Sequence, residues 1–167
     1  MQEHRYSVDI DGTPDEVWGV FWSRRSFRGP DGMGIEILHP GDDVGEGLVR
    51  HCWFHVPRYL LSGGKAESWE WLTKVDPPRS WKYDAVGKPL WSRAEGWTEL
   101  EDLGGGRTRV HFRETYHAFN PLARALLEKR VHHFISGNND KMIAAAVNEG
   151  VRRMRAARAD RAATDPR

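Results

Sequence analysis

Hydrophobic and polar residues alternate along most of the chain, and this pattern predicts a protein made mainly of β-strands. In residues 4–11 the side chains of Tyr6, Val8 and Ile10 share one face. Further segments of this kind cover residues 33–39, 47–56, 66–75, 81–86, 91–103 and 107–119. The links between the last six segments are short and rich in turn residues, so we expect one antiparallel sheet of seven strands.

Helix signals follow the first strand. Thr13, Pro14 and Glu16 combine an N-cap, a proline at the first helical position and a capping box. We therefore expect a short helix from this point. A second short helix is expected over residues 23–28, before the turn at Gly29-Pro30.

A long helix is expected at the other end of the chain. Asn120 and Pro121 supply its cap and first-turn proline, and helix-forming residues then dominate to about Ala157. The first part of its apolar stripe consists of Leu127, Val131, Phe134, Ile135 and Met142. Near Gly137 the stripe rotates, which predicts a kink or a change in the surface that the helix contacts. We expect residues 158–167 to fray.

The composition fits one cytoplasmic domain over residues 1–157. The chain has 167 residues and a formal net charge of +1, which argues against a dedicated nucleic-acid binder. Its one cysteine, Cys52, excludes an intramolecular disulfide and fits a reducing compartment. The N-terminus shows no secretory signal, and no apolar run approaches the roughly 18 residues of a membrane span. The arginine-rich segment 152–161 is expected to be a solvated helix tail, with a weak anionic-surface contact as the alternative.

Several segments match a known family in their order along the chain. They are YSVDIDGTPDEVW (residues 6–18), PGDDVGEGLVR (40–50), VDPPR (75–79), GRTRV (106–110) and the helix start at Asn120-Pro121. This order resembles the START-like, polyketide cyclase/dehydrase domains of the SRPBCC superfamily. The resemblance implies an α+β helix-grip fold, in which a curved antiparallel sheet wraps around a long C-terminal helix. Members bind lipids, polyketides, sterols, hormones or quinones between sheet and helix, and some cyclise or dehydrate their substrate. The resemblance supplies no catalytic motif and no cofactor.

Three polar residues on the expected strands are candidates for chemistry. Glu114 and Tyr116 share a strand face with Phe112, so burial of that face would carry both polar groups inward. A buried carboxyl group tends to have a raised pKa and can act as a general acid or base. The alternative is that Glu114 lies at the rim of the sheet or forms a structural bridge. Arg50 could pair with it or clamp a ligand oxygen, although the alternation leaves open which face of residues 47–56 points inward.

Aromatic and small side chains are expected to line a pocket beside these polar groups. The expected inner faces contribute Trp69, Trp71, Tyr83, Ala94, Gly96, Thr98 and Phe112, and the long helix contributes Phe134. The rings would form flat walls for an apolar ligand, and the small residues would leave volume between them. The alternative for each ring is that it fills the core.

No metal site and no cofactor are expected. His51 and His55 share a strand face but lie about 13 Å apart at strand rise, too far to chelate one ion together. Cys52 points the other way. Of the adjacent His132 and His133 on the helix, at most one can face a cavity. Nucleophile-elbow, metalloprotease and dinucleotide-binding motifs do not occur in the chain.

Three functions follow, in order of preference. The first is binding of a hydrophobic small molecule, lipid-like or polyketide-like and aromatic, between the sheet and the long helix. The second is a cofactor-free polyketide cyclase or dehydrase that uses Glu114, Arg50 or Tyr116. The third is a protein-interaction module such as a co-chaperone or antitoxin-like partner. The sequence also leaves a homodimer open.

Overall fold

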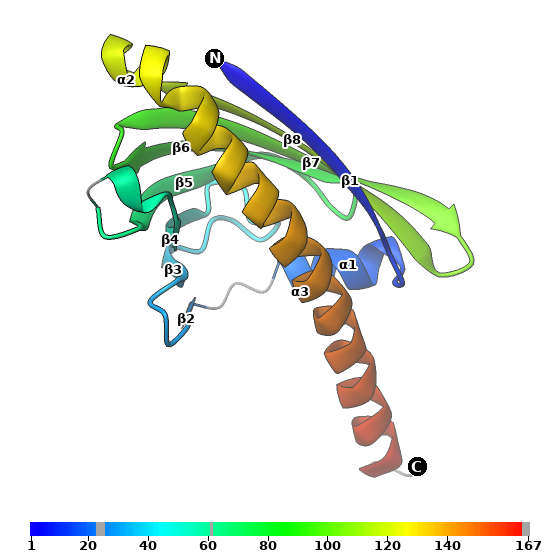
Figure 1. Cartoon of the computed structure of the whole chain (residues 1–167). Helices are drawn as coiled ribbons and strands as arrows, with labels where there is room; N and C mark the ends of the chain where they lie inside the picture. Colours follow the sequence, from blue (N-terminus) through cyan, green and yellow to red (C-terminus); the bar gives the residue numbers. More distant parts are fainter. Residues whose placement is uncertain (23–25, 61, 165–167) are drawn as a thin grey trace.

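The computed structural model describes residues 1–22, 26–60 and 62–164 and arranges the strands in one curved sheet (Figure 1). The strands are β1 (Gln2–Ile10), β2 (Phe27–Arg28), β3 (Gly34–His39), β4 (Val49–His55), β5 (Lys65–Asp76), β6 (Ser80–Lys88), β7 (Ser92–Gly104) and β8 (Arg107–Ala118). The helices are α1 (Pro14–Phe21), the 3-10 turn η1 (Arg58–Leu60), α2 (Pro121–Leu126) and α3 (Glu128–Thr164). The sheet order is β1-β8-β7-β6-β5-β4-β3-β2, and all neighbours are antiparallel. The expected helix-grip fold is confirmed.

The described sheet has eight strands where seven were expected. The additional strand, β2, pairs Phe27 and Arg28 with Ile35 and Gly34 of β3. A glycine suits this pairing because a Cβ atom on Gly34 would overlap the backbone of Phe27. The expected second short helix is therefore wrong at residues 27–28, and residues 23–25 lie outside the described residues.

Helix α1 begins where the sequence predicts. The Thr13 hydroxyl accepts a hydrogen bond from the Glu16 N–H, and the Glu16 carboxylate accepts from the Thr13 N–H at 3.0 Å. This capping box satisfies backbone donors that a helix start leaves unpaired. Val17 on the inner side of α1 is fully buried, so the cap and the core together hold the helix against the sheet.

The C-terminal helix differs from the expectation in its limits. A break at Leu127, where φ is −120°, divides it into α2 and α3. Helix α3 then passes through Gly137 without interruption and reaches Thr164 (Figure 1). Helix α3 thus continues past Ala157 as far as Thr164, and fraying of residues 158–167 stays a prediction. No described helix is both long and apolar enough to span a membrane.

The buried face of α3 matches the expected apolar stripe only in part, since it includes Val131, which is 1% exposed. Phe134 and Met142 are 39% and 57% exposed, whereas the polar residues His132 and Ser136 are buried. Hydrophobicity alone could not find this face, because its first half carries polar groups. Farther along, Val147 and the following buried positions are apolar, as expected.

The apolar core lies where α1 and α3 meet the sheet. The main contacts of α3 with other elements are with β1, β8, α1 and α2. One core cluster consists of Ile10, Val17, Val110, Val147 and Val151. A second cluster consists of Leu48, Leu72 and Trp81, against which the aromatic residues of α1 pack. Burial of these side chains is the main source of stability in such a fold.

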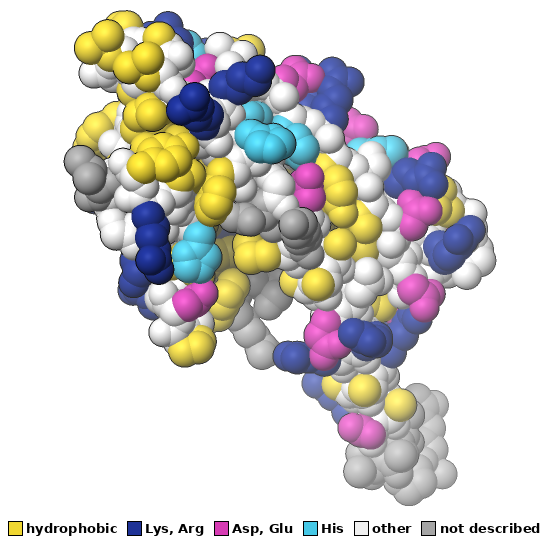
Figure 2. All heavy atoms as spheres, in the orientation of Figure 1, with side chains coloured by type: hydrophobic (Ala, Val, Ile, Leu, Met, Phe, Trp, Pro, Cys, Tyr) yellow, Lys and Arg dark blue, Asp and Glu magenta, His cyan; other side chains and the backbone are white. Residues whose placement is uncertain are grey.

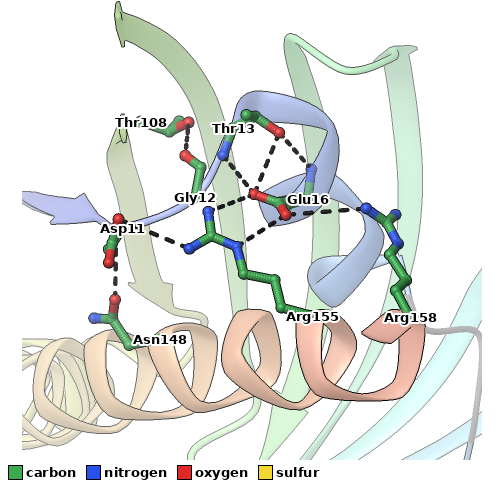
Figure 3. A network of polar contacts seen from close by, with 8 residues as sticks. All are labelled: Asp11, Gly12, Thr13, Glu16, Thr108, Asn148, Arg155 and Arg158. Atoms are coloured by element: carbon green, nitrogen blue, oxygen red, sulfur yellow. Dashed lines mark hydrogen bonds and ion pairs between the residues drawn. The ribbon is translucent and has the colours of Figure 1, made fainter. Parts of the chain in front are cut away.

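A polar network fixes the C-terminal half of α3 to the start of α1 (Figure 3). Arg155 donates to both carboxylate oxygens of Glu16, at 3.0 and 2.8 Å, and Arg158 lies 3.9 Å from the same carboxylate. Nearby, Thr108 donates to the carbonyl of Gly12 at 2.7 Å. The hydrogen bond from Arg155 is the main cause that lowers the pKa of Glu16 to about 2. Arg155 and Arg158, which belong to the arginine-rich segment 152–161, therefore hold α3 against the start of α1.

Candidate functional site

Polar side chains form a row across the inner face of the sheet, the face on which α1 and α3 pack. Cross-strand pairing places Arg50 of β4 opposite Glu70 of β5. It also places Gly96 of β7 between Tyr83 of β6 and Glu114 of β8. Strand alternation thus brings Arg50, Glu70, Tyr83 and Glu114 onto one surface. We call these four residues the inner polar row.

One end of the inner polar row is an ion pair. Arg50 Nε and Nη2 each lie 2.7 Å from Glu70 Oε2, and Ser68 donates to Glu70 Oε1 at 2.8 Å. The two charged side chains are 23% and 13% exposed. Burial acts to lower the pKa of Arg50, but the neighbouring carboxylate outweighs it and the net shift is upward. Arg50 therefore stays charged and keeps the planar donors that suit a ligand oxygen.

The ion pair settles which face of β4 points inward. Arg50 shares its face with the buried residues Leu48 and Cys52. Burial raises the pKa of the Cys52 thiol well above its usual range. Cys52 is therefore a protonated, inert thiol on the inner face and no nucleophile at neutral pH.

The other end of the row is a tyrosine–carboxyl pair built over a glycine. The Tyr83 hydroxyl donates to Glu114 Oε1 at 2.7 Å. These two residues are not on adjacent strands, and the ring of Tyr83 passes over Gly96 to reach the carboxyl group. A Cβ atom on Gly96 would overlap that ring. Gly96 is thus a spacer that allows the hydrogen bond, a role that only the residue without a side chain can fill.

Both groups of this pair have raised pKa values. Burial raises the pKa of Glu114, and the hydrogen bond from Tyr83 acts against the shift without cancelling it. Burial and the charge of Glu114 raise the pKa of Tyr83. A carboxyl group with a raised pKa can hold or release a proton closer to neutral pH than an ordinary glutamate. The pair can therefore donate a hydrogen bond to a ligand or exchange a proton with it.

Helix α3 and β1 add further polar groups beside the row. His4 of β1 lies opposite Glu114 and contacts both carboxylate oxygens of Asp140 on α3, at 3.0 and 2.9 Å. The ring of His132 on α3 stacks on Tyr116, with centroids 5.6 Å apart. Burial lowers the pKa of His132 to about 4, so its imidazole is neutral at pH 7. The side chain of His133 is exposed, which agrees with the expectation that at most one histidine of the pair faces inward.

Aromatic side chains form a wall next to the polar groups. Phe112 stacks with Tyr6 at 6.2 Å between centroids and meets Phe21 of α1 edge-on at 5.9 Å. Trp81 meets Trp18 of α1 edge-on at 5.3 Å. The inner face therefore changes from aromatic to polar within two residues along β6 and β8.

None of the four residues of the inner polar row is fully buried. The space-filling view shows the surface hollowed between the β2–β4 side of the sheet and α3 (Figure 2). Beyond the row, a partly open cavity of about 20 Å³ between Phe54, Tyr116, Val131 and Ile135 has room for about one water molecule. A groove of about 660 Å³ that includes Arg79 and Glu99 is open to solvent and contains none of the candidate residues.

Most expected site residues do face inward. The pairing registers place Arg50, Tyr83, Ala94, Gly96, Thr98, Phe112, Glu114 and Tyr116 on the inner face. The structure brings Tyr83, Gly96 and Glu114 into one arrangement. It does not join Glu114 to Arg50 directly, because Arg50 pairs with Glu70 instead. Contact of any of these residues with a ligand stays a prediction.

Three expected lining residues are wrongly placed. Trp69 and Trp71 lie on the outer face, since the neighbouring Glu70 points inward. Trp69 stacks on His51 of β4 at 4.5 Å, and Trp71 is 39% exposed. Stacking across strands stabilises Trp69 on the outer face without burial in the core, and single exposed aromatic residues such as Trp71 are common on protein surfaces. Phe134 is also exposed, because the buried face of this part of α3 consists of other residues, namely Val131, His132 and Ser136.

Sequence reasoning missed Glu70, Asp140 and the roles of His4 and Ser136. A signal for Glu70 did exist. The residues on its face of β5 include Ala66, Ser68 and Leu72, all buried, and small or apolar residues at alternate positions also indicate an inner face. No such signal marked Asp140, whose partner is 136 residues away in the chain.

Comparisons with known proteins agree with this fold. The family model described as "Polyketide cyclase / dehydrase and lipid transport" matches residues 1–158. A conserved protein from Geobacillus kaustophilus superposes with a TM-score of 0.68 at 14% identity, covering 91% of this chain and 96% of that one. The Zhui aromatase/cyclase from Streptomyces sp. R1128 has a TM-score of 0.68 at 19% identity and coverages of 93% and 97%.

A START superfamily protein from Mycobacterium smegmatis has a TM-score of 0.63 at 12% identity, with coverages of 91% and 98%. At these identities the likeness concerns the fold. A comparison with curated protein sequences found no match. The match to the family model spans nearly the whole chain, and the chain therefore belongs to the polyketide cyclase / dehydrase and lipid transport family.

Proposed function

We propose that the protein binds a small molecule with a mainly apolar body and a polar end on the inner face of its sheet. The observation that carries this proposal is the inner polar row. Charged groups are costly in a protein interior, and here they are partly exposed next to an aromatic wall. An apolar surface with a few convergent polar groups is the usual form of a small-molecule site.

Two buried groups on α3 support the same ligand. Nε2 of His132 and Oγ of Ser136 are buried and have no hydrogen-bond partner within the described part of the chain. The two residues are one helical turn apart and face the sheet. Buried polar groups are normally paired, so a hydroxyl or carbonyl group of a ligand beside α3 would satisfy them.

A binding experiment with a matched pair of variants tests the proposal. The probe is 1-anilinonaphthalene-8-sulfonate, which joins aromatic rings to a polar group, and its fluorescence is titrated against the protein. Ala94→Trp would fill the inner face between Ala85 and Tyr116, whereas Glu95→Trp adds the same ring to the outer face. We expect at least about tenfold weaker binding in Ala94→Trp and unchanged binding in Glu95→Trp. Equal affinities in the two variants would contradict the proposal.

Catalysis of the cyclase or dehydrase type is the second candidate, and the Tyr83–Glu114 pair favours it. A neutral Glu114 could protonate a ligand carbonyl oxygen while a base removes the proton from the adjacent carbon, which yields an enol. Arg50 could orient the same ligand through a second oxygen. The test is turnover of a synthetic poly-β-ketone thioester, followed by mass spectrometry. Product formation that is unchanged in Glu114→Gln and Tyr83→Phe would exclude this mechanism.

A further inference from the structure

Exposed hydrophobic side chains gather at one end of the molecule. They come from η1, the β6–β7 loop, α2 and the first turns of α3. Their members are Tyr59, Trp91, Phe119, Leu122, Leu126 and Phe134, with exposures between 39% and 73%. We call this group the α2 patch. Figure 2 shows hydrophobic side chains concentrated over α2 and the adjoining end of the sheet, with basic side chains beside them.

The elements of the α2 patch are neighbours in space. The Phe119 N–H donates to the Trp91 carbonyl at 2.9 Å, which joins the β6–β7 loop to the start of α2. Leu60 of η1, Leu90 of the β6–β7 loop and Val131 of α3 line the same small cavity. The exposed side chains therefore form one continuous surface, and a surface of this kind on a soluble domain usually marks a contact site.

The charge of this end differs from that of the whole chain. Residues 57–60, 88–91 and 119–134 contain Arg58, Lys88, Arg124, Lys129 and Arg130 but only one carboxylate, Glu128. That carboxylate is 1% exposed and accepts a hydrogen bond from the Ala118 N–H. Lys88 is paired with Glu67 of β5 at 2.8 Å. The other four cations are exposed, although the net charge of the chain is only +1.

We propose that the α2 patch docks on the surface of an anionic lipid bilayer. Leucine and aromatic side chains insert at the boundary between head groups and acyl chains, and lysine and arginine next to them contact the anionic head groups. The α2 patch has both features together, which a purely apolar or a purely basic surface lacks. The exposed charged side chains at this end are all positive, opposite in sign to an anionic bilayer.

The position of the α2 patch links docking to the inner face. The small cavity under the patch includes Phe54 and Tyr116, which belong to the inner face of the sheet. An apolar ligand that enters from the bilayer would thus reach the inner face only where the side chains around this cavity, which has room for about one water molecule, move apart. This consequence rests on the proposed function, whereas docking itself does not.

Co-sedimentation with vesicles tests the proposal. The full chain is mixed with vesicles of phosphatidylcholine alone or of phosphatidylcholine with phosphatidylglycerol. We expect binding to the mixed vesicles that weakens as salt increases. Leu122→Glu should weaken this binding at least about tenfold, because it places a carboxylate in the patch. Met142→Glu is the matched control, since Met142 is an exposed residue of α3 outside the patch, and we expect it to bind as the wild type does.

A second pair of variants separates local from overall charge. Lys129→Glu/Arg130→Glu reverses two cations of the patch, and Arg152→Glu/Arg153→Glu reverses two cations on the same helix far along the chain. We expect at least about tenfold weaker binding in the first variant and little change in the second. Equal losses in both would mean that overall charge drives adsorption, and this would overturn the proposal.

Two further outcomes would overturn docking. One is wild-type protein that does not sediment with the mixed vesicles. The other is a dimer in size-exclusion chromatography that Leu122→Glu dissociates, which would assign the patch to a second copy of the chain. The effect of Ala94→Trp on the fluorescent probe is measured separately. If that effect holds while vesicle binding fails, docking is wrong and the proposed ligand site stands.

Discussion

The apolar core and the inner polar row lie two residues apart on the same strands, and yet their chemistry is opposite. Leu72 of β5 is buried against α1, whereas Glu70 on the same face is charged and partly exposed. On β6, Trp81 belongs to the core, whereas Tyr83 packs against the edge of that cluster and donates its hydroxyl to Glu114 in the row. The change occurs where the cover of the aromatic side chains of α1 ends. The comparison shows that the covering helix, and not strand alternation, decides which inner positions are apolar.

The two regions also differ in what they contribute. The core gains free energy by removing apolar surface from water. The row holds a carboxyl group whose pKa is raised by burial, which means that its charged form is disfavoured. Proteins commonly keep such groups where activity requires them, at some loss of stability. The core should therefore dominate folding, and the row should be dispensable for it.

Truncation in the core should have the largest effect. Ile10→Ala removes a side chain that is 1% exposed between the sheet and α3. We expect the free energy of unfolding to fall by about 2–5 kcal/mol, measured by urea denaturation, because a cavity remains. Leu38→Ala, at a position that is 51% exposed, should change it by less than about 0.5 kcal/mol. Similar losses of unfolding free energy in both variants would contradict the distinction between core and surface.

Filling the glycine spacer should disturb the row directly. Gly96→Ala places a methyl group where the Tyr83 ring lies, and the ring must move away from Glu114. We expect a loss of about 1–3 kcal/mol in urea denaturation and weaker binding of the fluorescent probe. Gly137→Ala is the control, since nothing lies near an added Cβ there. Because alanine favours a helix over glycine, the control should gain about 0.5–1 kcal/mol.

Acid should weaken the anchor that holds α1 over the core. The folded pKa of Glu16, about 2, lies below the value of 4.5 expected for an unfolded chain. Its contribution is therefore complete above pH 4.5 and is lost as the pH falls toward 2. We expect the wild type to lose about 1 kcal/mol more than Glu16→Gln over this range in urea denaturation, after allowance for solvent screening at Arg155.

The control for the acid effect is Glu149→Gln. Glu149 also pairs with arginines, at 2.6 and 2.7 Å, but both partners are well exposed on α3. Its loss should leave the pH dependence of unfolding nearly as in the wild type. If Glu16→Gln kept the full acid dependence of the free energy of unfolding, the ion pair between Glu16 and Arg155 would not be its cause.

The smallest effect on stability should come from substitution in the inner polar row, and its pH dependence should have the opposite sign to that of Glu16. Burial raises the folded pKa of Glu114, so its favourable contribution is complete below the unfolded value and is lost as the pH rises through the folded value. At pH 7 Glu114→Gln should therefore be as stable as the wild type, or up to about 1 kcal/mol more stable. Tyr83 can still donate to the amide oxygen.

Glu95→Gln is the matched control for this last comparison. Glu95 is on the outer face of β7 and pairs with Lys82 at 3.3 Å, so its substitution should be neutral or slightly destabilising. Urea denaturation at pH 7 measures both variants. A loss of more than about 2 kcal/mol in Glu114→Gln would make the row part of the structural core.

The fold was predictable because its signals are local. Alternation along each strand, turn residues between strands and the caps at Thr13 and Asn120 all act within a few residues. The strand β2 escaped prediction because two residues are too short to show alternation. The break at Leu127 has no sequence signal, since leucine is a good helix former.

The site was predictable only in part, because each face of β5 had features that are typical of an inner face. The face of β5 that carries Trp69 and Trp71 is the more hydrophobic one, and hydrophobicity therefore favoured this face as the inner one. Cross-strand stacking with His51 on the outside and the pairing of Arg50 with Glu70 on the inside reversed that assignment. For a related reason, hydrophobicity could not decide whether His132 or His133 faces inward. A buried helix face that carries polar groups cannot be recognised by an apolar stripe.

Cys52 makes the inner face accessible to vibrational spectroscopy. It is the one cysteine of the chain, it is buried, and it lies beside Arg50 on the face that the proposed ligand would contact. Its protonated thiol has an S–H stretching band in a region of the infrared spectrum where other protein groups do not absorb. The frequency of that band depends on local hydrogen bonding and field. The unlabelled protein could thus report the arrival of a ligand through a single resolved vibration.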